Sequence, residues 1–171
     1  MSGSVPEALR PPAGWPLPVS AILLAAWLGA ALYFSIVVTR AAFAVLPSRT
    51  LAGALVGHTL PVLYDTGMLV GAALIFAAWK STTGAARTTS LLGGIAIVGL
   101  TLVARFVILA RIARLRLTLP SAIETLNVDD PARRAFGQLH AMSVGALALA
   151  ILAGLIVMIV LAHSLTIVAH D

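Results

Sequence analysis

Four stretches of this sequence stay apolar for longer than a bilayer requires, and this feature constrains the fold more than any other. A helix needs about 20 mostly apolar residues to cross roughly 30 Å of hydrocarbon, because each residue rises about 1.5 Å. The predicted helices cover residues 17–46, 51–79, 91–117 and 135–169, and the apolar part of the third ends near Ala110. Barrel strands are excluded, since they need only about 10 residues of alternating character. The pattern predicts an all-α fold, a four-helix transmembrane bundle with short connections.

The composition excludes a water-soluble globule. Apolar residues make up 60% of the chain and charged residues 10%, where soluble domains have about 45–50% and about 25%. The absence of cysteine excludes a disulfide scaffold, a thiolate metal site and a cysteine nucleophile. Residues 1–16 contain four prolines and are expected to form a flexible arm. Residues 17–171 are therefore interpreted as one transmembrane domain.

The connections between the helices are short, and the third one is distinctive. Pro47–Thr50 predicts a tight turn that makes the first two helices antiparallel neighbours. Lys80–Ser90 is expected to form a short polar loop. In the third connection Arg111, Arg114 and Arg116 alternate with leucine and isoleucine. This pattern predicts a short amphipathic extension that lies along the membrane surface, with its arginines at headgroup phosphates.

The basic residues are distributed unequally between the two sides of the predicted bundle. Seven lie on the side of the first and third connections, and three lie on the other side. The first group comprises Arg40, Arg49, Arg111, Arg114, Arg116, Arg133 and Arg134, and the second comprises Arg10, Lys80 and Arg87. The positive-inside rule places the larger group in the cytoplasm and both termini outside it. We therefore attribute the net charge of +5 to basic residues that orient the chain in the membrane and attract lipid headgroups. Nucleic acid is not an expected partner.

Asp65 is the most informative polar residue, because it lies at the middle of the second predicted helix. An isolated carboxylate is costly at that depth, so Asp65 should be protonated, hydrogen-bonded or paired. Tyr33, Tyr64 and Thr66 are the donors expected within reach. One interpretation is a proton-accepting or cation-binding site of a carrier, assisted by a helix kink at Pro61. The other is a neutral carboxyl group that links two helices.

Two histidines and one arginine are predicted to share a layer near the cytoplasmic side. His58 and His140 lie about 7–11 Å inside their helices at about 1.5 Å per residue, and Arg105 is expected at the same level. Two imidazoles on facing helices can ligate haem iron, and an arginine can pair with a propionate. A single histidine can also hold a copper or magnesium centre. The alternative is that these side chains only form hydrogen bonds in the headgroup region.

Glycines four residues apart are expected to form the seams where the helices pack, because small residues allow close approach in lipid. The pairs are Gly53 with Gly57 and Gly67 with Gly71, and a third set comprises Gly137, Ala141 and Gly145.

The sequence contains no metalloprotease, serine-hydrolase or nucleotide-binding motif. The first hypothesis is therefore a noncatalytic structural or accessory subunit of a larger membrane complex, with the bilayer and other membrane subunits as partners. The haem or metal protein and the carrier remain the alternatives.

Two short stretches resemble a bacterial family of uncharacterised four-helix membrane proteins. They are AAWLGAALYFSIVVTRAAFAVLPSRTLAG at Ala25–Gly53 and FGQLHAMS at Phe136–Ser143. The family is related to the eukaryotic transmembrane protein associated with cisplatin resistance and more distantly to copper-resistance membrane domains. Where the family commonly has proline before the alanine and phenylalanine, this chain has Arg40. The resemblance implies a four-span fold, a bacterial inner-membrane location and a family role for His140, and it gives Asp65 no support.

Overall fold

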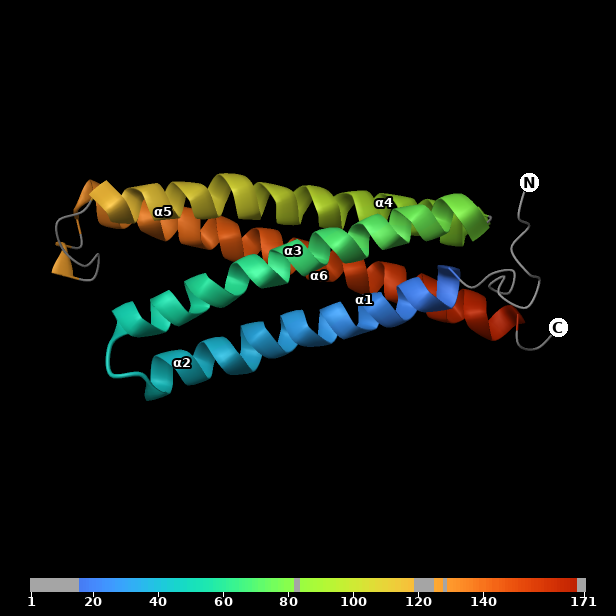
Figure 1. Ribbon diagram of the computed structural model, residues 1–171, viewed down its shortest axis with the longest axis horizontal. Helices are drawn as coiled ribbons and strands as arrows, with labels where there is room; N and C mark the ends of the chain where they lie inside the picture. Colours follow the sequence, from blue (N-terminus) through green and yellow to red (C-terminus); the bar gives the residue numbers. More distant parts are fainter. Residues whose placement is uncertain (1–15, 82–83, 119–124, 128, 169–171) are drawn as a thin grey trace, which may run out of the picture.

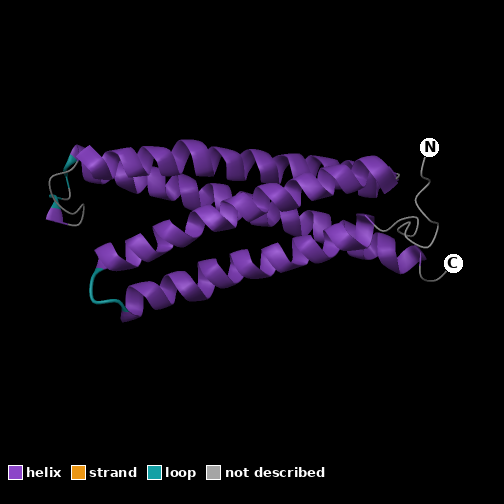
Figure 2. Cartoon of the chain, viewed as in Figure 1, coloured by secondary structure: helices purple, strands orange, loops and turns teal. Residues whose placement is uncertain are grey.

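A computed structural model describes residues 16–81, 84–118, 125–127 and 129–168 of the protein. Within these residues the regular structure is entirely helical (Figure 2). The elements are α1 (Pro16–Tyr33), the π-helix η2 (Phe34–Val38), α2 (Thr39–Val45), α3 (Arg49–Ser81), α4 (Gly84–Leu102), the π-helix η3 (Val103–Ile108), α5 (Leu109–Thr118) and α6 (Pro131–Val168). The arm predicted for residues 1–16 lies outside the described residues, except for Pro16 at the start of α1.

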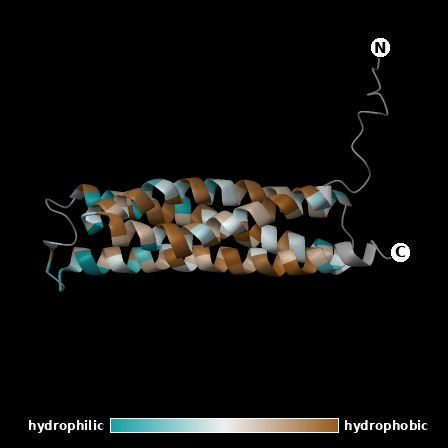
Figure 3. Ribbon diagram, turned by 90° about the horizontal axis from the view of Figure 1, so that it is seen from below, coloured by the Kyte–Doolittle hydropathy of each residue, from teal (hydrophilic) through white to brown (hydrophobic). Residues whose placement is uncertain are grey.

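These elements form four long rods, because α1, η2 and α2 follow one another without a break, as do α4, η3 and α5 (Figure 1). The apolar spans run over Pro18–Val45, Arg49–Lys80, Ala86–Thr118 and Pro131–Ser164. Each is long and apolar enough to cross a membrane. Hydrophobic residues extend along the rods, and hydrophilic residues gather toward their ends (Figure 3). The predicted four-helix transmembrane fold is confirmed.

The turn between the first two rods is as tight as predicted. The hydroxyl oxygen of Ser48 accepts a hydrogen bond from the backbone N–H of Leu51 at 3.2 Å. The backbone carbonyl of Ser48 accepts a second one from the backbone N–H of Ala52 at 3.1 Å. A serine that satisfies free N–H groups in this way starts a helix efficiently. The helix that follows, α3, continues through Pro61 as one element.

The basic extension of the third rod is helical, but it does not turn onto the membrane surface. Figure 1 shows α5 in line with α4. Leu109 and Ile112 pack against the hydrophobic core, and this contact holds α5 to the bundle. The remainder of the third connection, residues 119–124 and 128, lies outside the described residues.

The half of the bundle that contains the start of α1 and the end of α6 is closely packed, and we call it the closed half. At Gly71 an added Cβ would lie 2.9 Å from the carbonyl oxygen of Gly94, and at Gly94 it would lie 2.8 Å from the carbonyl oxygen of Gly71. At Gly154 an added Cβ would lie 3.0 Å from the Cδ2 atom of the Leu28 side chain. Backbones in lipid approach this closely only where side chains are absent. The prediction of a glycine seam is confirmed for Gly71.

Candidate functional site

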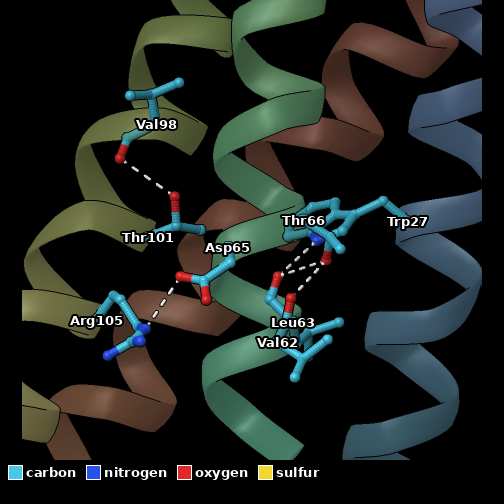
Figure 4. Close-up of polar contacts among 8 residues, drawn as sticks. All are labelled: Trp27, Val62, Leu63, Asp65, Thr66, Val98, Thr101 and Arg105. Carbon is cyan, nitrogen blue, oxygen red and sulfur yellow. Dashed lines mark hydrogen bonds and ion pairs between the residues drawn. The ribbon is translucent and has the colours of Figure 1, made fainter.

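An ion pair links the second and third rods near the middle of the bundle. Nε of Arg105 donates to Oδ1 of Asp65 at 3.0 Å (Figure 4). The side chains of Asp65 and Arg105 are 47% and 33% exposed, so the pair lies at the flank of the bundle. Charges at this depth of a membrane are expensive unless they are paired. The pair therefore compensates two charges that neither helix would carry alone at low cost.

The depth of Arg105 differs from the prediction. The sequence pattern placed it in a layer with His58 and His140, because the third span was expected to end near Ala110. The span runs to Thr118, so Arg105 lies about 20 Å from that end at roughly 1.5 Å per residue. This greater depth brings it level with Asp65.

The donors predicted for Asp65 are engaged or directed elsewhere. The hydroxyl of Tyr64 is bonded to the carbonyl and hydroxyl oxygens of Ser143 at 3.0 and 2.9 Å. The hydroxyl of Thr66 donates to backbone carbonyls of its own helix (Figure 4), and Tyr33 is 60% exposed. Arg105 replaces them, because a guanidinium on a neighbouring helix neutralises the charge that a hydroxyl only solvates.

A cavity of about 860 Å³ opens between α2, α3, α5 and α6, and we call it the arginine cavity. Most of its lining is apolar, and its charged lining residues are all basic. They are Arg49, Arg105, Arg116 and Arg133. Since no aspartate or glutamate is among the described residues that line it, the cavity should attract anions.

Arg116 reaches across this cavity from α5. Its guanidinium lies 5.4 Å from the ring centroid of Phe136 on α6. On the opposite wall, Cβ atoms added at Gly53 and Gly57 of α3 would lie 3.6 Å from its two terminal nitrogens. The predicted seam of Gly53 and Gly57 therefore faces a guanidinium and not another helix.

A second cavity of about 250 Å³ adjoins the first, and we call it the apolar recess. The two share Thr39, Val56, Leu60, His140 and Ser143 as lining residues. The recess is otherwise lined mainly by apolar side chains such as Phe34, Leu147 and Ile151. Together the two cavities form a wide basic space that narrows into an apolar one.

Both π-helical segments border these cavities. Arg105 and Phe106 of η3 line the arginine cavity, and Phe34 and Ser35 of η2 line the apolar recess. The hydroxyl of Thr39 donates to the Phe34 carbonyl at 3.0 Å where η2 ends. Since π-helical turns occur frequently at functional sites, this coincidence identifies the cavities as the candidate site. Sequence periodicity gave no signal for either segment.

The two predicted histidine ligands occupy different surroundings. His140 lines both cavities, and its ring stacks on Phe136 with a centroid distance of 6.2 Å. His58 is exposed on α3 and lines neither cavity. The described residues contain no group of three histidine, aspartate or glutamate side chains that could hold a metal ion. The two-histidine haem or metal site stays a prediction.

Comparison with known proteins assigns the chain to a family. No curated protein and no solved structure matches it. Residues 22–120 match the family described as a domain of unknown function, DUF4149. The matched range includes Ala25–Gly53, Asp65 and Arg105 and ends before Phe136–Ser143. Because the match covers more than half of the chain, this four-span protein belongs to the DUF4149 family.

Proposed function

We propose that the protein is a noncatalytic accessory subunit of a larger membrane assembly, joined to it through the outer face of α6. That face comprises Gln138, Ala141 and Gly145, all exposed. Nothing lies within 4 Å of a Cβ added at Gly145, so the bundle itself does not require a glycine there. A glycine inside a helix costs about 0.5–1 kcal/mol relative to alanine. A second helix packing against this face would offset that cost.

The side chain of Gln138 supports a protein partner over lipid tails. Its amide is exposed on the same face and forms no hydrogen bond within the described part of the chain. Amide side chains inside a span bond to polar groups of a neighbouring helix, whereas acyl chains offer neither donors nor acceptors. The open glycine and the amide thus favour the same kind of partner.

We place this subunit in a bacterial inner membrane, with both termini outside the cytoplasm. The support is the excess of arginine at the α2–α3 turn and the α5–α6 connection. We also propose that the family is related to the cisplatin-resistance protein and, more distantly, to copper-resistance membrane domains.

Gently solubilised native membranes provide the test. The protein should elute as an assembly of fixed stoichiometry, heavier than its own 17.6 kDa. Gly145→Leu should release it as a monomer, because the added side chain occupies the interface. Gly99→Leu is the matched control, since Gly99 is also exposed and open. A wild-type monomer, or an equal effect of both substitutions, contradicts the proposal.

The Asp65–Arg105 pair favours a second candidate, a proton- or cation-coupled carrier. A proton or cation that binds Asp65 would release Arg105, so the pair would serve as the coupling element near mid-membrane. In liposomes, Asp65→Asn should abolish ion-dependent flux. Asp129→Asn should leave it intact, because that carboxylate pairs with Arg134 in an exposed position. Flux that is insensitive to Asp65→Asn excludes this role.

A further inference from the structure

Three arginines from three helices line the arginine cavity near its outer end. Arg49 begins α3, Arg116 lies near the end of α5, and Arg133 lies near the start of α6. Neither Arg49 nor Arg116 forms an ion pair within the described part of the chain, and Arg133 donates to the carbonyl of Leu126 at 2.8 Å. Like charges that share one cavity without a counter-ion repel one another. A bound anion would convert this repulsion into attraction.

The fourth arginine has its own counter-ion. Arg105 lies about 16 Å deeper along the same rod as Arg116, at roughly 1.5 Å per residue, and it is paired with Asp65. Among the described residues, the positive charge of the cavity that has no paired carboxylate is therefore concentrated at its outer end. A ligand would place its anionic group there.

The cavity wall between the level of Arg105 and that of the three outer arginines is apolar, so it would contact a hydrophobic part of a ligand. Leu60, Leu109 and Ile112 line it, and the apolar recess continues from it past Leu147 and Ile151. The volume of about 860 Å³ is within the roughly 300–1,000 Å³ range of ligand sites. Free phosphate would leave this surface without a partner.

The position of the cavity gives such a ligand a route from the bilayer. The α1–α2 rod and the first half of α3 diverge from α5 and α6 toward this end (Figure 1). The three outer arginines lie at or near the ends of their spans, which is the depth of lipid headgroups. A lipid can therefore enter sideways with its head at the level of the arginines and its chain in the hydrocarbon.

We propose that the arginine cavity binds an acidic phospholipid. Its phosphate lies among Arg49, Arg116 and Arg133, and one acyl chain follows the apolar wall into the recess. Charge selects the headgroup, and the apolar length of the site selects a lipid over a soluble anion. This site is independent of the outer face of α6.

The test uses delipidated full-length protein in a neutral detergent and compares phosphatidylglycerol with phosphatidylcholine of the same acyl chains. The acidic lipid should bind at least about tenfold more tightly, and Arg116→Gln should remove about tenfold of its affinity, which is the size of one charge-assisted hydrogen bond. Arg114→Gln is the matched control, because Arg114 lies on the same helix, is exposed and does not line the cavity. It should change the affinity by less than about twofold.

Two further variants keep the test decisive if Arg116→Gln disturbs folding. Gly57→Leu fills the wall beside Arg116, and Arg49→Gln removes a second headgroup contact. Each should weaken phosphatidylglycerol binding while circular dichroism keeps the wild-type helix content.

Three outcomes overturn the proposal. Equal affinity for the two lipids means that charge does not select the ligand. Equal losses in Arg114→Gln and Arg116→Gln mean that diffuse surface charge is responsible. Displacement of the lipid by inorganic phosphate at equal concentration means that the site binds a free anion. Because each arm uses the isolated chain, none of these results bears on the assembly tested through Gly145.

Discussion

The two halves of α3 carry the same glycine spacing and use it in opposite ways. In the closed half, the backbone of Gly71 lies directly against that of Gly94. In the other half of the bundle, which contains the arginine cavity and which we call the open half, Gly53 and Gly57 face the guanidinium of Arg116. Small residues permit close helix contact, but they do not enforce it when a long charged side chain occupies the seam. One half thus supplies stability, and the other supplies space.

The largest expected effect comes from adding one methyl group to each half. Gly71→Ala should destabilise the protein by about 1–3 kcal/mol, because its Cβ meets backbone atoms that cannot move aside. Gly57→Ala should be neutral or stabilising by up to about 1 kcal/mol, since its Cβ has only ordinary contacts. Unfolding in mixed micelles measures both. Similar losses at the two sites would remove the distinction between the halves.

The ion pair at the flank of the bundle should give an intermediate effect. In a double-mutant cycle with Asp65→Asn and Arg105→Gln, the coupling energy should be about 1 kcal/mol, within the range of polar contacts between membrane helices. Asp129→Asn with Arg134→Gln is the control cycle, since that pair is well exposed, and its coupling should be near zero. Equal coupling in the two cycles would mean that depth in the membrane gives the Asp65–Arg105 pair no advantage.

The smallest expected effect concerns the boundary between the halves. Tyr64 is fully buried, and its hydroxyl ties α3 to α6 through Ser143. Tyr64→Phe should cost about 0.6 kcal/mol, the average for such bonds in membranes. Tyr33→Phe should cost nothing measurable, because Tyr33 is exposed. If the two substitutions give the same free energy of unfolding, the hydrogen bond between Tyr64 and Ser143 does not help to hold α3 against α6.

The fold was predictable from the sequence because each span is specified locally. A long apolar segment forms a helix in lipid whatever its neighbours are, since its backbone has no other partner. The turn at Pro47 and Ser48 was predictable for the same reason, as both residues act on the adjacent backbone. The helical extension with Arg111, Arg114 and Arg116 was also predicted, but the predicted direction along the membrane surface was wrong.

The candidate site was not predictable, because it depends on where different helices meet. The depth of Arg105 followed from the true end of its span at Thr118, which apolarity alone did not reveal. The spacing of Gly53 and Gly57 indicated a small face but not what lies opposite it. The outward direction of Gly145 likewise depends on how α6 is rotated within the bundle. These features depend on how the helices pack against one another, and a single sequence does not specify that packing in a form that can be recognised by inspection.

Cysteine labelling tests the contrast between an open, basic half and a closed one most directly, because the chain has no cysteine of its own. Ala113→Cys places a thiol in the lining of the arginine cavity, and Ser90→Cys places a buried one at a similar distance from the opposite membrane surface. An anionic thiosulfonate should label Ala113→Cys at least about tenfold faster than a cationic one, since the arginines concentrate anions. Ser90→Cys should resist both reagents. Equal labelling at the two positions, or faster labelling of Ala113→Cys by the cation, would contradict the account.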